Sequence, residues 1–167
     1  MLHYLAWLEQ CGFSRWMRES EMAFPVALLF HTLGLALLVG TNGMIDLRVL
    51  GVARSLPLGP MKRFFSLLWL GFSLNAISGV ALLIAYPTKE LTNPVFYVKL
   101  AFIALGLINM RLLGQQVFHD PSLDHRPVAM KGKILACTSL FFWIGAITTG
   151  RLLGYTYTHL QIGRAHV

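Results

Sequence analysis

The residues best suited to chemistry in this chain are a few polar side chains inside long apolar stretches. His31 lies in the first stretch, Lys99 near the start of the third, and Thr148 and Arg151 near the end of the fourth. A helix rises by about 1.5 Å per residue, which would bring His31 and Lys99 to a similar depth in a membrane. These four residues therefore form a candidate ligand-binding site near one membrane surface.

Two interpretations of this group remain open. A shared pocket of His31, Lys99 and Arg151 would suit an anion, a quinone head or a haem propionate, and Glu19 or Glu21 could reach it from the rim. Charge inside a bilayer is costly and usually faces the bundle or a partner. Alternatively, Lys99 and Arg151 extend into the lipid headgroups. His31 would then be a neutral imidazole hydrogen-bonded between helices.

A haem b cofactor is a further alternative for His31. A membrane cytochrome b usually needs two axial histidines at matched depth on facing helices, and only His31 lies inside an apolar stretch. Two other histidines share a loop with two aspartates, a solvated cluster that we do not expect to hold a metal; its members are His119, Asp120, Asp124 and His125. The cysteine and histidine spacings predict no metal site.

The sequence contains no pattern typical of an enzyme acting alone. We find no nucleophile–base pairing, no pair of acids and no phosphate-binding loop, so we expect no catalytic residues. Three functions remain open: a ligand-handling membrane protein, a haem b electron-transfer subunit, and an accessory subunit. The partner of the protein would be another membrane protein or further copies of this chain. The net charge of +7 does not indicate nucleic acid, because the basic residues gather in loops between apolar stretches.

Four apolar stretches must position these residues. The chain has 167 residues, of which 56% are hydrophobic and 13% charged. Each stretch has about the 20 residues that a membrane-spanning helix needs. We therefore predict an all-α, antiparallel four-helix bundle in the lipid bilayer over residues 21–157. Its spans would cover about 24–44, 64–86, 95–113 and 134–153.

The two ends of the chain are expected to lie outside the bundle. Residues 1–20 predict a short amphipathic helix in the membrane interface, where Trp7 and Trp16 suit the headgroup region. A turn is expected at Gly12–Ser14. Residues 162–167 resemble the translation of a DNA-sequencing adapter, so we interpret them as a non-native tail.

The distribution of Lys and Arg predicts the orientation. Eight basic residues lie in the segments between spans one and two and between spans three and four, whereas three lie in the N-terminal segment and the 87–94 loop. The positive-inside rule then places both termini outside the bacterial inner membrane. Cys11 and Cys137 would face opposite sides, which makes a mutual disulfide unexpected.

Small and polar residues predict how the helices contact one another. Gly71, Asn75, Ser78 and Gly79 share one face of the second span. Such residues allow the close backbone approach that helix association in lipid requires. Asn75 and Asn109 predict hydrogen bonds between helices. Two charged residues at the end of the first span predict a local ion pair: Asp46 and Arg48.

Several phrases of the sequence carry a family resemblance. They are His31-x-Leu33-Gly34, Asp46-Leu47-Arg48-x-Leu50-Gly51, Trp69-x-Gly71-Phe72, Asn93-Pro94-x-Phe96-x-x-Lys99 and Gly150-Arg151. Together they resemble a widespread bacterial family of four-span membrane proteins that is known as a domain of unknown function. The stretch from Phe96 to Asn109 is also faintly similar to the membrane domain of the copper-resistance protein D family. The resemblance implies fold and location, and no activity.

Overall fold

Helices account for the secondary structure throughout the described part of the chain. The computed structural model describes residues 2–52, 56–118 and 128–164, and the side chains among them at 4–52, 56–116 and 128–155. Two short helices come first, α1 (Leu2–Glu9) and α2 (Gly12–Glu19). The long elements follow, with a 3₁₀ turn and a short helix between them: α3 (Ala23–Leu50), η1 (Gly59–Arg63), α4 (Phe64–Ala85), α5 (Pro87–Leu91), α6 (Pro94–Phe118) and α7 (Met130–Arg164).

Four of these helices are long and apolar enough to cross a membrane. They confirm the predicted all-α fold with four apolar helices. Helices α3, α6 and α7 are longer than the predicted apolar stretches, because less apolar residues continue each of them, whereas α4 ends one residue before its predicted end. For example, α3 ends only where Gly51 adopts a left-handed φ of 97°, a conformation that glycine accepts without steric cost.

The N-terminal segment differs in detail from the prediction. The chain turns at residues 10–11, so Gly12 begins α2 and the expected turn at Gly12–Ser14 was wrong. At the other end, the backbone of α7 continues to Arg164, and residues 165–167 of the expected tail lie outside the described residues.

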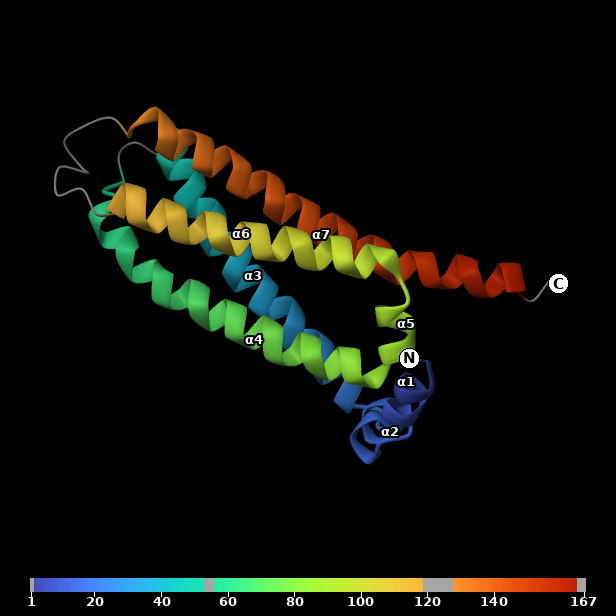
Figure 1. Ribbon diagram of the computed structural model, residues 1–167. Coiled ribbons are helices and arrows are strands. Elements are labelled where there is room, and N and C mark those ends of the chain that lie inside the picture. Colours follow the sequence, from blue (N-terminus) through green and yellow to red (C-terminus); the bar gives the residue numbers. More distant parts are fainter. Residues whose placement is uncertain (1, 53–55, 119–127, 165–167) are drawn as a thin grey trace.

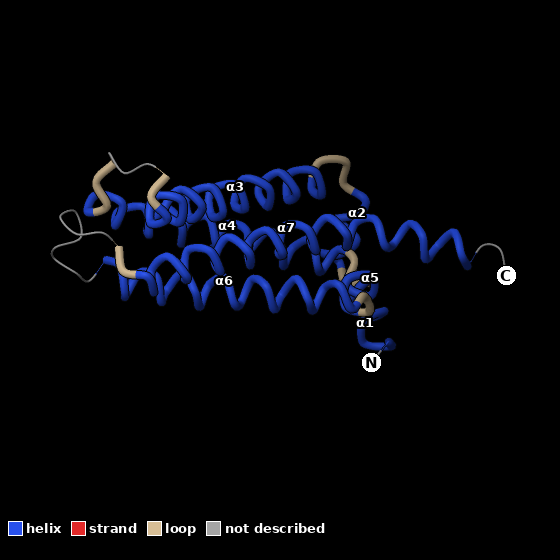
Figure 2. Tube along the Cα trace, turned by 90° about the horizontal axis from the view of Figure 1, so that it is seen from above, coloured by secondary structure: helices blue, strands red, loops and turns tan. Residues whose placement is uncertain are grey.

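The long helices form two antiparallel pairs, α3 with α4 and α6 with α7, which are joined mainly through α3 and α7. Figure 1 shows that the two pairs lie farther apart at the end where α5 connects them than at the opposite end. In the view from above, all four helices run along a common direction and α1, α2 and α5 gather at one end (Figure 2).

Glycines account for the close contact between α3 and α4. A Cβ added at Gly34 would lie 2.6 Å from the backbone nitrogen of Asn75, and one at Gly71 would lie 2.8 Å from that of Leu38. These distances leave no room for any side chain. The prediction that small residues bring these helices together is therefore confirmed.

The N-terminal helices dock on the end of α4. Ser14 donates its hydroxyl to the Ala85 carbonyl at 3.3 Å, and Arg18 donates to the same oxygen at 3.0 Å. Ala85 is the last residue of α4, where carbonyls lack partners within the helix. Trp7 and Trp16 remain exposed, at 67% and 57%. This surface fits the expected contact with the membrane interface.

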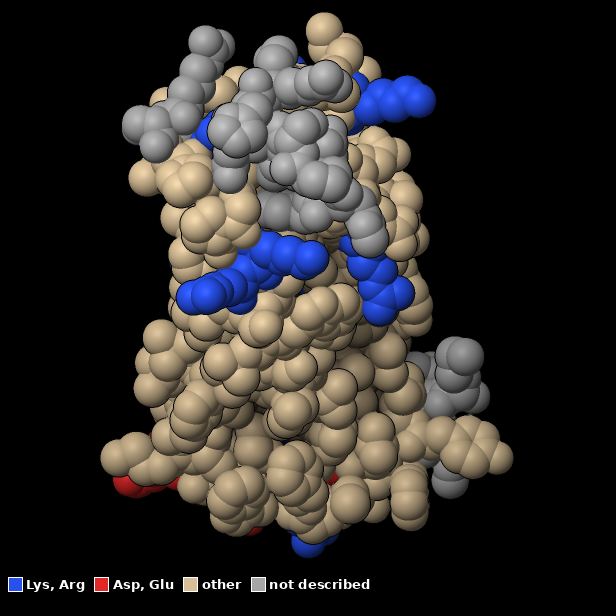
Figure 3. All heavy atoms as spheres, turned by 90° about the vertical axis from the view of Figure 1, so that its left-hand side faces the viewer, with Lys and Arg blue, Asp and Glu red and all other residues tan. Residues whose placement is uncertain are grey.

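The basic residues gather at the opposite end. Figure 3 shows Lys and Arg side chains on this end, around atoms that are not described. The described basic residues in the two connecting regions and the adjoining helix ends are Arg48, Lys62, Arg63, Arg111, Lys131 and Lys133. Arg54 and Arg126, the other two of the eight basic residues between the spans, lie outside the described residues.

Candidate functional site

His31 is held between α3 and α4 by hydrogen bonds to the backbone. Its Nδ1 lies 3.0 Å from the Asn75 carbonyl oxygen, and the Asn75 amide donates back to the His31 carbonyl at 2.8 Å. A carbonyl only accepts, so Nδ1 is the protonated nitrogen. In the neutral ring this leaves the lone pair on Nε2, for which no hydrogen bond is recorded among the described residues.

The ring of His31 also packs closely. A Cβ at Gly79 would lie 3.1 Å from its Cε1 atom. The Ser78 hydroxyl oxygen lies 3.3 Å from Nδ1, while its proton is directed to the Leu74 carbonyl at 2.6 Å. The orientation of the ring is therefore set by α4. This arrangement fits the expected imidazole bonded between helices, and it leaves Nε2 available.

Lys99 is the second residue of the candidate site, and the structure brings it near His31. Lys99 is partly buried, and its charge acts electrostatically on the imidazole. Its aliphatic chain runs past α7, because a Cβ at Gly150 would lie 3.7 Å from Lys99 Cε. The side chain of Lys99 therefore lies against the backbone of α7 at Gly150.

Glu90 supplies the carboxylate that the sequence analysis missed. It lies in α5, immediately before α6, and it attracts Lys99 electrostatically. Burial raises the pKa of Glu90, and the positive charges of Lys89 and Lys99 partly oppose this rise. The carboxylates expected from the rim, Glu19 and Glu21, are both exposed.

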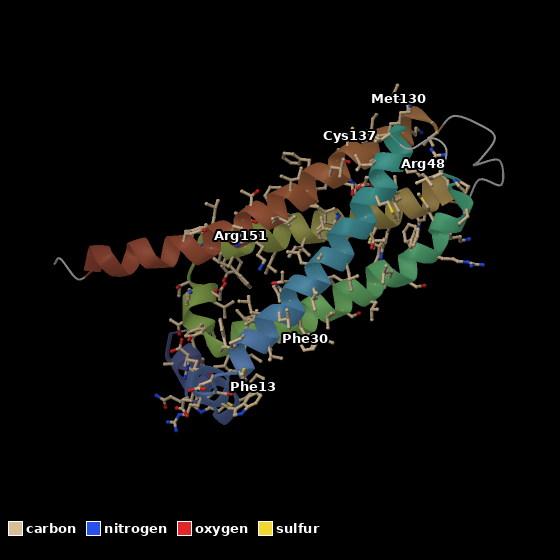
Figure 4. The ribbon with its side chains drawn as sticks, turned by 180° about the vertical axis from the view of Figure 1, so that it is seen from behind. Phe13, Phe30, Arg48, Met130, Cys137 and Arg151 are labelled. Carbon is tan, nitrogen blue, oxygen red and sulfur yellow. The ribbon has the colours of Figure 1, made fainter. Side chains whose placement is uncertain are left out.

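Thr148 and Arg151 lie apart from this group. Thr148 is exposed and donates its hydroxyl to the Ile144 carbonyl of its own helix at 2.8 Å. Arg151 is exposed as well, and no hydrogen bond or ionic contact with His31 or Lys99 is recorded for it in the described chain. Figure 4 shows Arg151 and Arg48 at opposite ends of the bundle. Electrostatic interactions thus link His31 to Lys99 and Lys99 to Glu90.

A second polar cluster lies between α3 and α7, in the half of the bundle that carries the basic loops. Asn42 donates to Asp46 Oδ2 at 2.5 Å and lies 2.8 Å from Ser139 Oγ. All three side chains are buried. The ion pair expected between Asp46 and Arg48 is wrong, because Asp46 turns into the bundle while Arg48 donates to the Leu56 carbonyl.

Asn109 makes the predicted bonds between helices. Its amide donates to Thr138 Oγ1 at 2.7 Å and to the Leu135 carbonyl at 3.1 Å. No group of three metal-binding side chains is found among the described residues. The loop of His119, Asp120, Asp124 and His125 lies outside them.

Comparison with protein-family models, curated proteins and solved structures finds no match to this chain. The resemblance to a four-span family therefore stays a prediction.

Proposed function

We propose that this protein is a bacterial inner-membrane protein that binds a quinone or quinol head between its two helix pairs, near the outer surface. His31 and Lys99 are the binding residues, and Glu90 adjusts the charge of the site. The observation that carries the proposal is the hydrogen bond from His31 Nδ1 to the Asn75 carbonyl, which leaves the lone pair of the neutral imidazole on Nε2.

The side chains of His31, Lys99 and Glu90 suit a quinone or quinol better than an anion. A lone pair on His31 Nε2 accepts a hydrogen bond from a hydroxyl, and the Lys99 ammonium donates one to a carbonyl or hydroxyl oxygen. A quinone or quinol offers these groups on one ring. An anion fits less well, because the Glu90 carboxylate offsets Lys99 and the neutral imidazole contributes no charge.

The location suits an amphipathic ligand. The site lies at the end where the helix pairs separate, and the surrounding spans carry apolar side chains. A long isoprenoid tail would stay in the bilayer while the polar head contacts His31 and Lys99.

Titration of the purified full chain in detergent with a short-tailed ubiquinone and its quinol tests the proposal. Loss of one hydrogen bond costs about 1.4 kcal/mol, so we expect His31→Phe and Lys99→Gln each to weaken binding about tenfold. Thr32→Val is the matched control, because the Thr32 hydroxyl is exposed and bonds only the Leu28 carbonyl of its own helix. Equal binding by wild type and His31→Phe would refute the proposal.

Haem b is the second candidate, and the same hydrogen bond favours it. A histidine that binds iron commonly donates its other ring N–H to a carbonyl, which orients the ring and strengthens Nε2 as a ligand. Expression with haem supply distinguishes the two candidates. A Soret band that co-purifies with wild type and is lost in His31→Phe would support haem, whereas colourless protein that binds quinol would exclude it.

A further inference from the structure

Asp46 is a carboxyl group in the interior of the bundle. It lies on α3, one turn before the end of the helix, and its side chain is 0% exposed. The neighbouring side chains of Asn42 and Ser139 are 1% and 0% exposed. Polar groups are seldom buried in the membrane without a role, and a carboxyl group is among the costliest.

The hydrogen bonds of this carboxyl group come from neutral donors. Asn42 donates to Oδ2 at 2.5 Å, and the Ser139 side chain also hydrogen-bonds the carboxyl group. The other oxygen, Oδ1, is buried without a partner in the described structure. Two neutral donors do not compensate the charge of an ionised carboxylate in a low-dielectric interior, where the uncompensated cost is several kcal/mol.

Among the described residues on the elements around Asp46, no cation is recorded in contact with it. Arg48 is bonded to the Leu56 carbonyl, and Arg111 lies over the ring of Trp69, 5.2 Å from its centroid. Five other described titratable groups lie on elements beside α3 at the basic end of the bundle, and none has a recorded ion pair with Asp46. They are Lys62 and Arg63 of η1 and Lys131, Lys133 and Cys137 of α7. Helix α4 carries no charged side chain.

A metal cation fits the cluster poorly. Hard cations take six or more oxygen ligands, and this cluster has one buried carboxylate oxygen without a partner. Asn42 directs its NH₂ group, not its oxygen, at both Asp46 and Ser139. A proton needs only the one free oxygen.

We infer that Asp46 is a proton-binding site, at which Oδ1 carries a proton at neutral pH and Asn42 and Ser139 hold the carboxyl group between α3 and α7. The proton on Oδ1 removes the negative charge for which the neutral donors do not compensate. The inference is independent of the quinone site, since the buried Leu38 lies on α3 between His31 and Asn42.

Infrared difference spectroscopy of the full chain in liposomes tests this inference. We expect wild type at neutral pH to show the C=O stretch of a protonated carboxylic acid, shifted in D₂O. Asp46→Asn should remove this band, while Glu90→Gln, which changes a partly buried carboxyl group outside the spans, should retain it. If wild type shows no such band at neutral pH, or if the band survives in Asp46→Asn, the inference is overturned.

A second variant keeps the test decisive if Asp46→Asn fails to fold. Ser139→Ala removes a donor that favours the ionised form, so the acid band should persist to higher pH than in wild type. An unchanged pH dependence in Ser139→Ala, or loss of the acid band on adding Na⁺ at constant pH, would count against a proton site at Asp46.

Discussion

At the scale of single residues, the outer site depends on what each polar group has as a partner. His31 has one ring nitrogen bound by the backbone and one without a recorded partner, whereas Thr148 uses its hydroxyl on its own helix. Glu90 and Lys99 attract each other from adjoining helices. Whether a polar residue can bind a ligand therefore depends less on its type than on whether its donors and acceptors already have partners.

Glu90 should make the stability of the protein depend on pH. Burial raises the pKa of Glu90 above its ordinary value, so the folded protein retains this proton to higher pH than the unfolded chain. Its contribution to stability is then fully present below the ordinary pKa and is lost as pH rises through the raised pKa. We expect the midpoint temperature in detergent to fall across this window in wild type, and to fall less in Glu90→Gln. The exposed Glu19→Gln is the control, and an equal flattening there would contradict the assignment.

Gly79 tests whether the position of the His31 ring matters for binding. A methyl group at this position would lie 3.1 Å from His31 Cε1, so the ring must shift by a few tenths of an ångström. We expect Gly79→Ala to weaken quinol binding several-fold while the protein stays folded, because alanine in a helix is about 1 kcal/mol more favourable than glycine. Gly40→Ala, with nothing within 4 Å of the added atom, should bind as wild type does. Identical affinities would show that the ring position is irrelevant.

At the scale of helices, the α3–α4 contact positions the site. The same backbone approach that excludes side chains at Gly34 and Gly71 brings the Asn75 carbonyl within reach of His31. The close packing of α3 against α4 therefore also fixes the orientation of the imidazole. Separation of the two helices would leave the ring free to rotate.

Gly34→Ala should destabilise the α3–α4 pair. The added Cβ would meet backbone atoms at 2.6 Å and 2.9 Å, and backbone cannot rotate away as a side chain can. We expect a loss of about 1–3 kcal/mol in the free energy of unfolding, measured by denaturation in detergent. Gly43→Ala on the same helix meets nothing within 4 Å and should be neutral or stabilising. A neutral Gly34→Ala would contradict the close contact described above.

The sequence predicts the helices far better than it predicts the partners of their polar residues. Length and hydrophobicity are sufficient for the four spans, and glycine spacing indicates the close face of α4. The approach of Glu90 to Lys99 depends on how the short α5 folds back, which no periodicity encodes. The burial of Asp46 depends on the rotation of α7, which directs Ser139 toward α3. Because Asp46 lies near the end of α3, the sequence predicted an ion pair with Arg48, and this prediction was wrong.

At the scale of the whole molecule, charge and aromatic residues divide between the two ends. The end formed by η1 and the start of α7 carries lysine and arginine. In α1 and α2, Glu9 and Glu19 balance Arg15 and Arg18 in charge, and these helices expose Tyr4, Trp7, Phe13 and Trp16. Aromatic side chains favour the membrane interface, and positive loops favour the cytoplasm. We therefore propose that α2 and the His31 site lie on the outer side.

Thiol labelling tests this orientation, because the chain offers a natural probe at one end. Cys11 is exposed between α1 and α2, and Cys137 lies on α7 within a span. In cells with a permeabilised outer membrane and an intact inner membrane, we expect a membrane-impermeant maleimide to label Cys11. With Cys11→Ser and Lys62→Cys combined, labelling should appear only after the inner membrane is opened, because Lys62 lies at the basic end. Labelling in the reverse order would invert the topology and move the His31 site to the cytoplasmic side.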